Sequence, residues 1–126
     1  MTGMTESSPA TANATPTPKP RDVDAREFPA ELRDAVADHD LVLVDFYTKG
    51  CSLCQAIEPV LGNVARGTGI TVVMVNPGHD IELVDEWSIR SAPTLVLVED
   101  GEEVARLAEG FQGGDDIEAF LDEHSA

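Results

Sequence analysis

The side chains best suited to chemistry in this 126-residue chain are its two cysteines, Cys51 and Cys54, which are separated by two residues. They follow an apolar run that predicts a buried strand, and a helical pattern follows them. At a helix N-terminus, unpaired N–H groups and the helix dipole favour an anion, which should lower the thiol pKa of Cys51. Cys54 lies one turn further along the same face, so the pair can close a small disulfide loop.

This arrangement predicts thiol–disulfide exchange. The Cys51 thiolate would attack a substrate disulfide and form a mixed disulfide, which Cys54 would resolve by attacking Cys51. Lys49, two residues before Cys51, would add positive charge beside the thiolate.

Two other interpretations of the pair are half of a zinc site and two buried structural thiols. Structural zinc usually needs four cysteine or histidine ligands, and the chain has no second C-x-x-C. Its histidines, His39, His79 and His124, show no pair spacing. We therefore expect no metal and no cofactor, and a metal carrier is an alternative that metal analysis of the reduced protein would test.

The spacing of apolar residues predicts eight elements in the order α-β-α-β-α-β-β-α. They cover residues 28–38, 41–47, 51–65, 70–75, 80–87, 94–98, 104–107 and 115–124. Strands joined through a helix should lie parallel, and the last two, joined by the Asp100-Gly101 turn, should pair antiparallel. The predicted fold class is α/β, with a mixed four-stranded sheet that helices flank on both faces.

The composition changes along the chain. Residues 1–21 are rich in Ser, Thr, Ala and Pro, which predicts a disordered tail before one domain at 22–126. The chain has no apolar run near 18 residues, and its start lacks an export signal and a lipidation cysteine. We therefore expect a cytoplasmic protein, and in that compartment a close cysteine pair is typical of catalysis or metal binding.

The charge is strongly acidic, with 24 Asp and Glu against 8 Lys and Arg, a net charge of −16. Such a surface repels phosphate backbones and anionic lipids, so we expect no nucleic-acid partner and no membrane partner. Because salt screens self-repulsion, the charge suggests a halophilic source. An ordinary acidic protein is the alternative.

From Phe28 to Leu121 the residues resemble the thioredoxin family. The family's order is matched by Asp45-Phe46 before the C-x-x-C, Pro59 five residues after Cys54, Ala92-Pro93-Thr94, the Asp100-Gly101 turn and Gly110. The resemblance implies a thioredoxin-like fold and the activity of a protein-disulfide oxidoreductase. The family's usual first strand is not visible before Phe28, so we expect four strands, with five as the alternative.

The resemblance also implies roles for single residues. Asp45 matches a buried aspartate, whose raised pKa would let it exchange a proton with Cys54; the alternative is a partly exposed Asp at a strand end. Pro93 matches a cis-proline that faces the disulfide, whereas alone it would indicate only the start of a strand. Ala92 would offer its backbone to an extended substrate, and Leu53 and Gly110 would complete the substrate surface.

Two departures from the family pattern concern the redox properties. The family commonly has Trp-Cys-Gly-Pro-Cys where this chain has Gly50-Cys51-Ser52-Leu53-Cys54. Because the residues around the cysteines influence thiolate stability, the sequence predicts a potential more oxidising than that of ordinary thioredoxins. Met74 aligns with a lysine that the family often pairs with the aspartate, which predicts a simpler proton relay.

The function that we expect is disulfide exchange in protein substrates by a monomeric oxidoreductase that serves cell redox homeostasis and electron transport. Electrons would come from a thioredoxin-reductase-like protein or a small thiol. The alternative is a non-catalytic module that uses the groove at Pro93 for binding or its cysteines for redox sensing.

Overall fold

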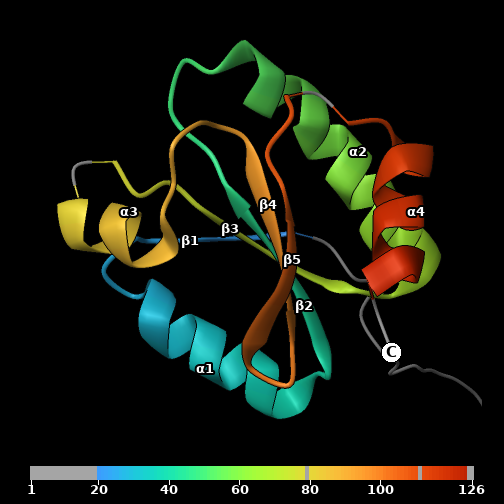
Figure 1. Cartoon of the computed structure of the whole chain (residues 1–126), viewed down its shortest axis with the longest axis horizontal. Coiled ribbons are helices and arrows are strands. Elements are labelled where there is room, and N and C mark those ends of the chain that lie inside the picture. Colours follow the sequence, from blue (N-terminus) through green and yellow to red (C-terminus); the bar gives the residue numbers. More distant parts are fainter. Residues whose placement is uncertain (1–19, 79, 111, 125–126) are drawn as a thin grey trace, which may run out of the picture.

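A computed structural model of the protein describes residues 20–78, 80–110 and 112–124, and these form one sheet with helices on both faces (Figure 1). The elements are β1 (Arg21–Val23), α1 (Phe28–Asp38), β2 (Leu41–Phe46), α2 (Ser52–Thr68), β3 (Thr71–Val75), α3 (Ile81–Trp87), β4 (Thr94–Glu99), β5 (Glu102–Leu107) and α4 (Gly114–His124). The α/β class and the mixed sheet are as the sequence predicts. No helix in the described ranges is long and apolar enough to cross a membrane.

The sheet has five strands in the order β1-β3-β2-β4-β5, so the five-stranded alternative is the one observed. The family's first strand, which is not visible in the sequence before Phe28, is present as β1. Strand β1 has three residues, pairs with β3 alone at the sheet edge, and exposes Arg21 and Asp22. Such a short, charged edge strand has no apolar run that the sequence could reveal. It begins inside the range expected to be a disordered tail, and residues 1–19 of that range lie outside the described residues.

Strands β1 and β2 run parallel to β3, but β4 runs antiparallel to β2. The expectation that every strand joined through a helix lies parallel was therefore wrong for β4. The connecting helix α3 has seven residues and is about 10 Å long, whereas a six-residue strand spans about 20 Å. The chain does not return to the starting edge of the sheet. Instead Thr94 opens β4 opposite Phe46, the last residue of β2.

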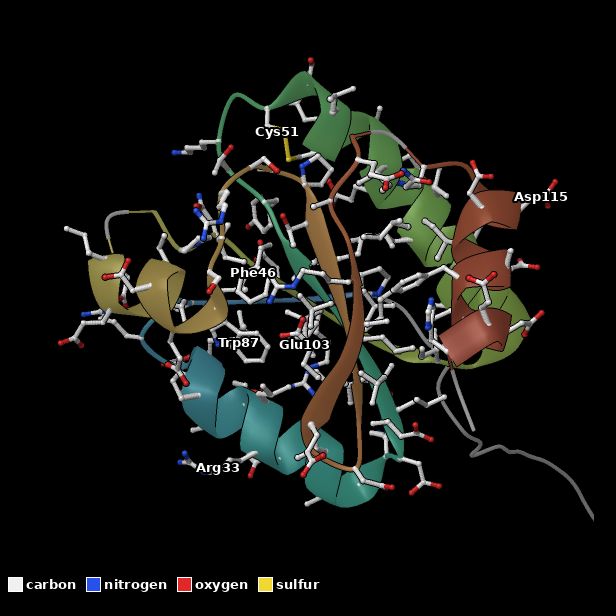
Figure 2. The ribbon with its side chains drawn as sticks, in the orientation of Figure 1. Arg33, Phe46, Cys51, Trp87, Glu103 and Asp115 are labelled. Atoms are coloured by element: carbon white, nitrogen blue, oxygen red, sulfur yellow. A yellow bond between two sulfur atoms is a disulfide. The ribbon has the colours of Figure 1, made fainter. Side chains whose placement is uncertain are left out.

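Alternating side chains of β2 supply two cores. Leu43 packs with residues of α2 and α4 on one face, and Val42 and Val44 pack with residues of α1 and α3 on the other. Phe46, on the second face, contacts Phe28 of α1 and Trp87 of α3 with ring centroids 5.6 and 5.4 Å away (Figure 2). By the same alternation, Asp45 points to the face that α2 covers.

Candidate active site

Cys51 and Cys54 form a disulfide between the end of β2 and the start of α2 (Figure 2). Their Cα atoms are 5.2 Å apart, within the usual range for a bridge. Cys51 is the N-cap of α2, and its Sγ accepts a hydrogen bond of 3.1 Å from the backbone N–H of Cys54. After reduction, the same N–H and the helix dipole are placed to stabilise a Cys51 thiolate.

The two sulfurs differ in access. Cys54 is only 4% exposed, whereas Cys51 is half-buried. Just before Cys51, Gly50 has a φ of +77°, a left-handed conformation that glycine adopts without strain. A Cβ atom at Gly50 would meet no other atom within 4 Å, so the surface beside Cys51 is open on this side.

The four residues predicted to contact substrate lie around the sulfurs. The peptide bond between Ala92 and Pro93 is cis, and the Ala92 carbonyl oxygen is 3.8 Å from Cys51 Sγ. Leu53 is 44% exposed, and a Cβ atom added to Gly110 would lie 3.7 Å from its Cδ1 atom. The structure therefore brings the first turn of α2 and two separate loops together at the disulfide.

Asp45 is fully buried, with an exposed fraction of 0%, so it is not the partly exposed strand-end residue of the alternative interpretation. Both of its carboxylate oxygens lack a hydrogen-bond partner among the described residues. Burial is the main cause that raises its pKa from 3.8 to about 7, and the charges of Glu58 and Asp22 raise it further. Met74, in place of the family's lysine, pairs with Asp45 in the sheet register.

The sequence interpretation missed three residues near Asp45. Glu58 lies on α2, four positions after Cys54, and Asp22 lies on the unexpected strand β1. Tyr47 donates its hydroxyl to both carboxylate oxygens of Asp22, at 2.7 and 2.8 Å. Burial and this hydrogen bond raise the pKa of Tyr47. Tyr47 is two residues after Asp45 on the same face of the chain, and this spacing was the available signal.

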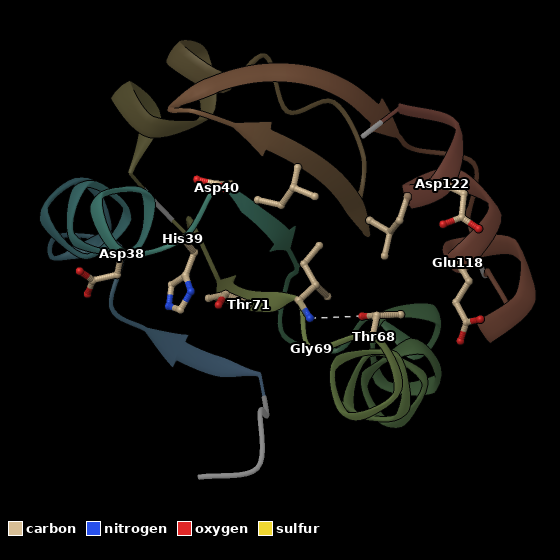
Figure 3. Close-up of a pocket in the computed structure, with 11 residues that line it drawn as sticks. Asp38, His39, Asp40, Thr68, Gly69, Thr71, Glu118 and Asp122 are labelled. Carbon is tan, nitrogen blue, oxygen red and sulfur yellow. Dashed lines mark hydrogen bonds between the residues drawn. The ribbon is translucent and has the colours of Figure 1, made fainter. Parts of the chain in front are cut away.

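A separate cavity of about 500 Å³ lies at the other end of the sheet, where β2 and β3 begin (Figure 3). Its acidic lining residues are Asp38, Asp40, Glu118 and Asp122. It contains no cysteine, so it takes no part in dithiol chemistry. Among the described residues, no group of three or more His, Cys, Asp or Glu is arranged to hold a metal ion.

A disulfide of the C-x-x-C type at a helix N-terminus, facing a cis-proline loop at the same end of a mixed sheet, defines a thiol–disulfide oxidoreductase of the thioredoxin fold. Comparison with known proteins agrees. The model of the family described as Thioredoxin matches residues 21–123. The chain belongs to the thioredoxin family, as the resemblance implied.

Named relatives and solved structures support this assignment. A thioredoxin of Chlamydia pneumoniae is 30% identical over 97 residues, which cover 76% of this chain and 94% of the relative. A thioredoxin of Alicyclobacillus acidocaldarius is 33% identical over 94 residues, 73% of this chain and 89% of the relative. The structure of a mutant thioredoxin from Halobacterium salinarum NRC-1 superposes with a TM-score of 0.77 at 32% identity, covering 90% of this chain and 97% of that one.

Proposed function

We propose that this oxidoreductase exchanges disulfides in protein substrates, with Cys51 as the attacking thiolate and Cys54 as the resolving thiol. The observation that carries the proposal is the asymmetry of the pair. Cys51 is the more exposed cysteine, and its Sγ accepts a hydrogen bond from the backbone N–H of Cys54 at the start of α2. Cys54 itself is buried. The accessible sulfur is thus the one whose anion the helix stabilises.

The reaction balances as a two-electron transfer from the dithiol to the substrate. The Cys51 thiolate attacks one substrate sulfur, the substrate S–S bond breaks, and the first substrate sulfur leaves as a thiolate that takes up a proton. Cys54 then loses its proton and attacks Cys51 Sγ. The mixed disulfide breaks, the second substrate sulfur leaves as a thiolate, and Cys51 and Cys54 are oxidised to the disulfide.

Asp45 is proposed as the group that takes the proton from Cys54 in the second step. Its side chain faces the layer of α2, the helix that carries Cys54, and its pKa of about 7 suits proton transfer near neutral pH.

The proposed substrate surface consists of Leu53, Ala92, Pro93 and Gly110. A target segment in extended conformation would run beside Ala92 and present its disulfide to Cys51, 3.8 Å away from the Ala92 carbonyl oxygen. We further propose that the protein acts as a cytoplasmic monomer in redox homeostasis and electron transport. A thioredoxin-reductase-like protein or a small thiol would supply its electrons.

Reduction of insulin by dithiothreitol tests the proposed function. The wild-type chain should accelerate insulin reduction, Cys51→Ser should abolish the acceleration, and Cys54→Ser should accumulate a mixed disulfide between Cys51 and the substrate. If the folded wild-type chain gives no acceleration and Cys51→Ser changes nothing, the alternative of a binding or redox-sensing module would be favoured.

The redox potential of the pair distinguishes a reductant from an oxidant. Because Gly50 leaves Cys51 open and Leu53 replaces the family's proline, we expect a potential above the value of about −270 mV for thioredoxin. Equilibration with glutathione, read by mass after thiol alkylation, measures it. A potential at or below the thioredoxin value would contradict the expected shift and indicate a reductant.

A further inference from the structure

Only some of the Lys and Arg side chains of this acidic chain have partners within the protein. Arg21, Arg26 and Arg106 form ion pairs with carboxylates, and Arg66 bonds to Asn63. Among the described residues, three cationic side chains have no hydrogen bond or ion pair: Arg33, Lys49 and Arg90. Their charges are therefore available to an external partner.

Two of these three cations border the sulfurs. Lys49 is two residues before Cys51 and Arg90 is two residues before Ala92, so each Cα atom lies within about 7.6 Å of the Cα atom of its site residue. The 3.8 Å approach of Cys51 Sγ to the Ala92 carbonyl oxygen joins the two loops. Arg33, the third cation, lies on α1, far from the labelled Cys51 (Figure 2).

The opposite side of the site differs in charge. The connection from β5 to α4 approaches the start of α2 from the other side in Figure 1, and there the exposed Glu109 precedes Gly110. The cavity at the far end of the sheet has an acidic lining. Lys49 and Arg90 therefore form a local positive edge on a chain of net charge −16.

We propose that Lys49 and Arg90 bind carboxylates beside the target disulfide, so that the preferred substrates are disulfides flanked by Asp or Glu. This inference rests on the proposed function and names its substrate class. Neither cation must break an internal ion pair before it binds, and both lysine and arginine form charge-assisted hydrogen bonds with carboxylates. The acidic flank would lie on the Lys49 side, away from Glu109.

Screening decides whether this edge can outweigh the negative charge of the whole chain. At an ionic strength of 0.15 M the Debye length is about 8 Å, so remote carboxylates are largely screened while charges in contact still attract. Exposed ion pairs are individually weak, so each cation should raise the reaction rate of an acidic substrate only about 1.4- to 5-fold.

Three peptides test the inference. Each has the same internal disulfide, flanked on both sides by Asp, Asn or Lys. The full chain is first reduced to the dithiol, and the rate at which it then reduces each peptide is measured. At 0.15 M KCl, the Asp-flanked peptide should react faster than the Asn-flanked one, which should react faster than the Lys-flanked one. At 1 M KCl, where the Debye length is about 3 Å, the ratios should approach one.

Three glutamine variants locate the effect. Lys49→Gln and Arg90→Gln should each lower the ratio of the Asp to the Asn rate about 1.4- to 5-fold, whereas the control Arg33→Gln should leave it unchanged. Lys49→Glu should favour the Lys-flanked peptide. A change in thiolate stability would affect all peptides alike, so the ratio reports docking.

The outcomes separate two failures. Equal rates for the three peptides, or a ratio that Arg33→Gln lowers as much as Lys49→Gln, would overturn the docking inference and leave the proposed function intact. Reduction of none of the peptides would overturn the proposed function itself.

Discussion

At Asp45, the stability of the fold and the proposed chemistry oppose each other. The carboxyl group has no hydrogen-bond partner among the described residues, so its ionised form is unfavourable in the native state. The same isolation holds its pKa at about 7, where a proton can be gained or lost near neutral pH. A well-packed apolar side chain would be more stable here but could not transfer a proton.

The raised pKa of Asp45 predicts how stability depends on pH. Between about pH 4 and pH 7 the native state holds a proton that the unfolded state has released, so the free energy of unfolding falls as the pH rises. A shift of about three pKa units corresponds to a decrease of roughly 4 kcal/mol in the free energy of unfolding, which is complete above pH 7. Asp45→Asn cannot ionise, so it should be more stable than the wild type by roughly this amount at pH 8.

Urea unfolding of the oxidised protein at pH 4 and pH 8 measures this difference. The variant and the wild type should have similar stabilities at pH 4, where Asp45 is protonated in the native state. Equal stabilities at both pH values would show that the Asp45 pKa in the native state is not raised.

At the scale of elements, one aromatic cluster joins two helices to the sheet. Phe28, the first residue of α1, is 1% exposed. The centroid of its ring lies 5.6 Å from that of Phe46 and 5.8 Å from that of Trp87. Because β2 ends at Phe46 and leads directly to the loop before Cys51, this cluster supports the strand end from which the site loop departs.

Phe28→Ala should lower the free energy of unfolding by about 3–5 kcal/mol, because a cavity would form among α1, α3 and the sheet. Trp87 fluorescence during denaturant unfolding measures the change, since Trp87 is the only tryptophan of the chain. The control Val104→Ala, at a side chain that is 41% exposed on β5, should have a much smaller effect. A similar loss from both substitutions would contradict the proposed support.

Sequence reasoning succeeded where the chain has a strong local pattern. The apolar run 41–47 predicted β2, which ends one residue earlier at Phe46, and the C-x-x-C spacing predicted the pair at the start of α2. It failed where tertiary geometry decides. The antiparallel direction of β4 depends on the path of the chain after α3, which no local pattern specifies, and the Tyr47–Asp22 hydrogen bond requires a strand that carries no apolar run.

The position of Ala92 shows a different source of information. Its approach to Cys51 spans 41 positions of sequence, and no local pattern predicts such a contact. Only the resemblance to a family placed Ala92, Pro93 and Gly110 at the site. The influence of Glu58 on Asp45 was missed because an exposed glutamate on a helix is ordinarily a solvated residue.

At the scale of the whole molecule, the net charge of −16 opposes folding through self-repulsion. Raising KCl from 0.1 to 1 M shortens the Debye length from about 10 to about 3 Å and should therefore stabilise the fold. A gain of about 1 kcal/mol would raise Tm by roughly 4–8 °C for a domain of this size. We propose a halophilic source on this ground.

Thermal unfolding at the two salt concentrations tests this prediction. Glu82→Gln combined with Glu86→Gln removes two exposed negative charges from α3 and should weaken the salt dependence. A Tm that does not rise with salt, or an equal rise in the double variant, would contradict a role for self-repulsion.

The sequence separation between the disulfide and the loop that faces it has a consequence for synthesis on the ribosome. The sulfur pair leaves the exit tunnel about forty residues before the backbone that faces it, because Cys51 and Ala92 are 41 positions apart. A nascent chain can close its cysteine loop, but it has no edge against which a target could align. Selectivity for substrates therefore arises only when the later part of the polypeptide has been made and folded.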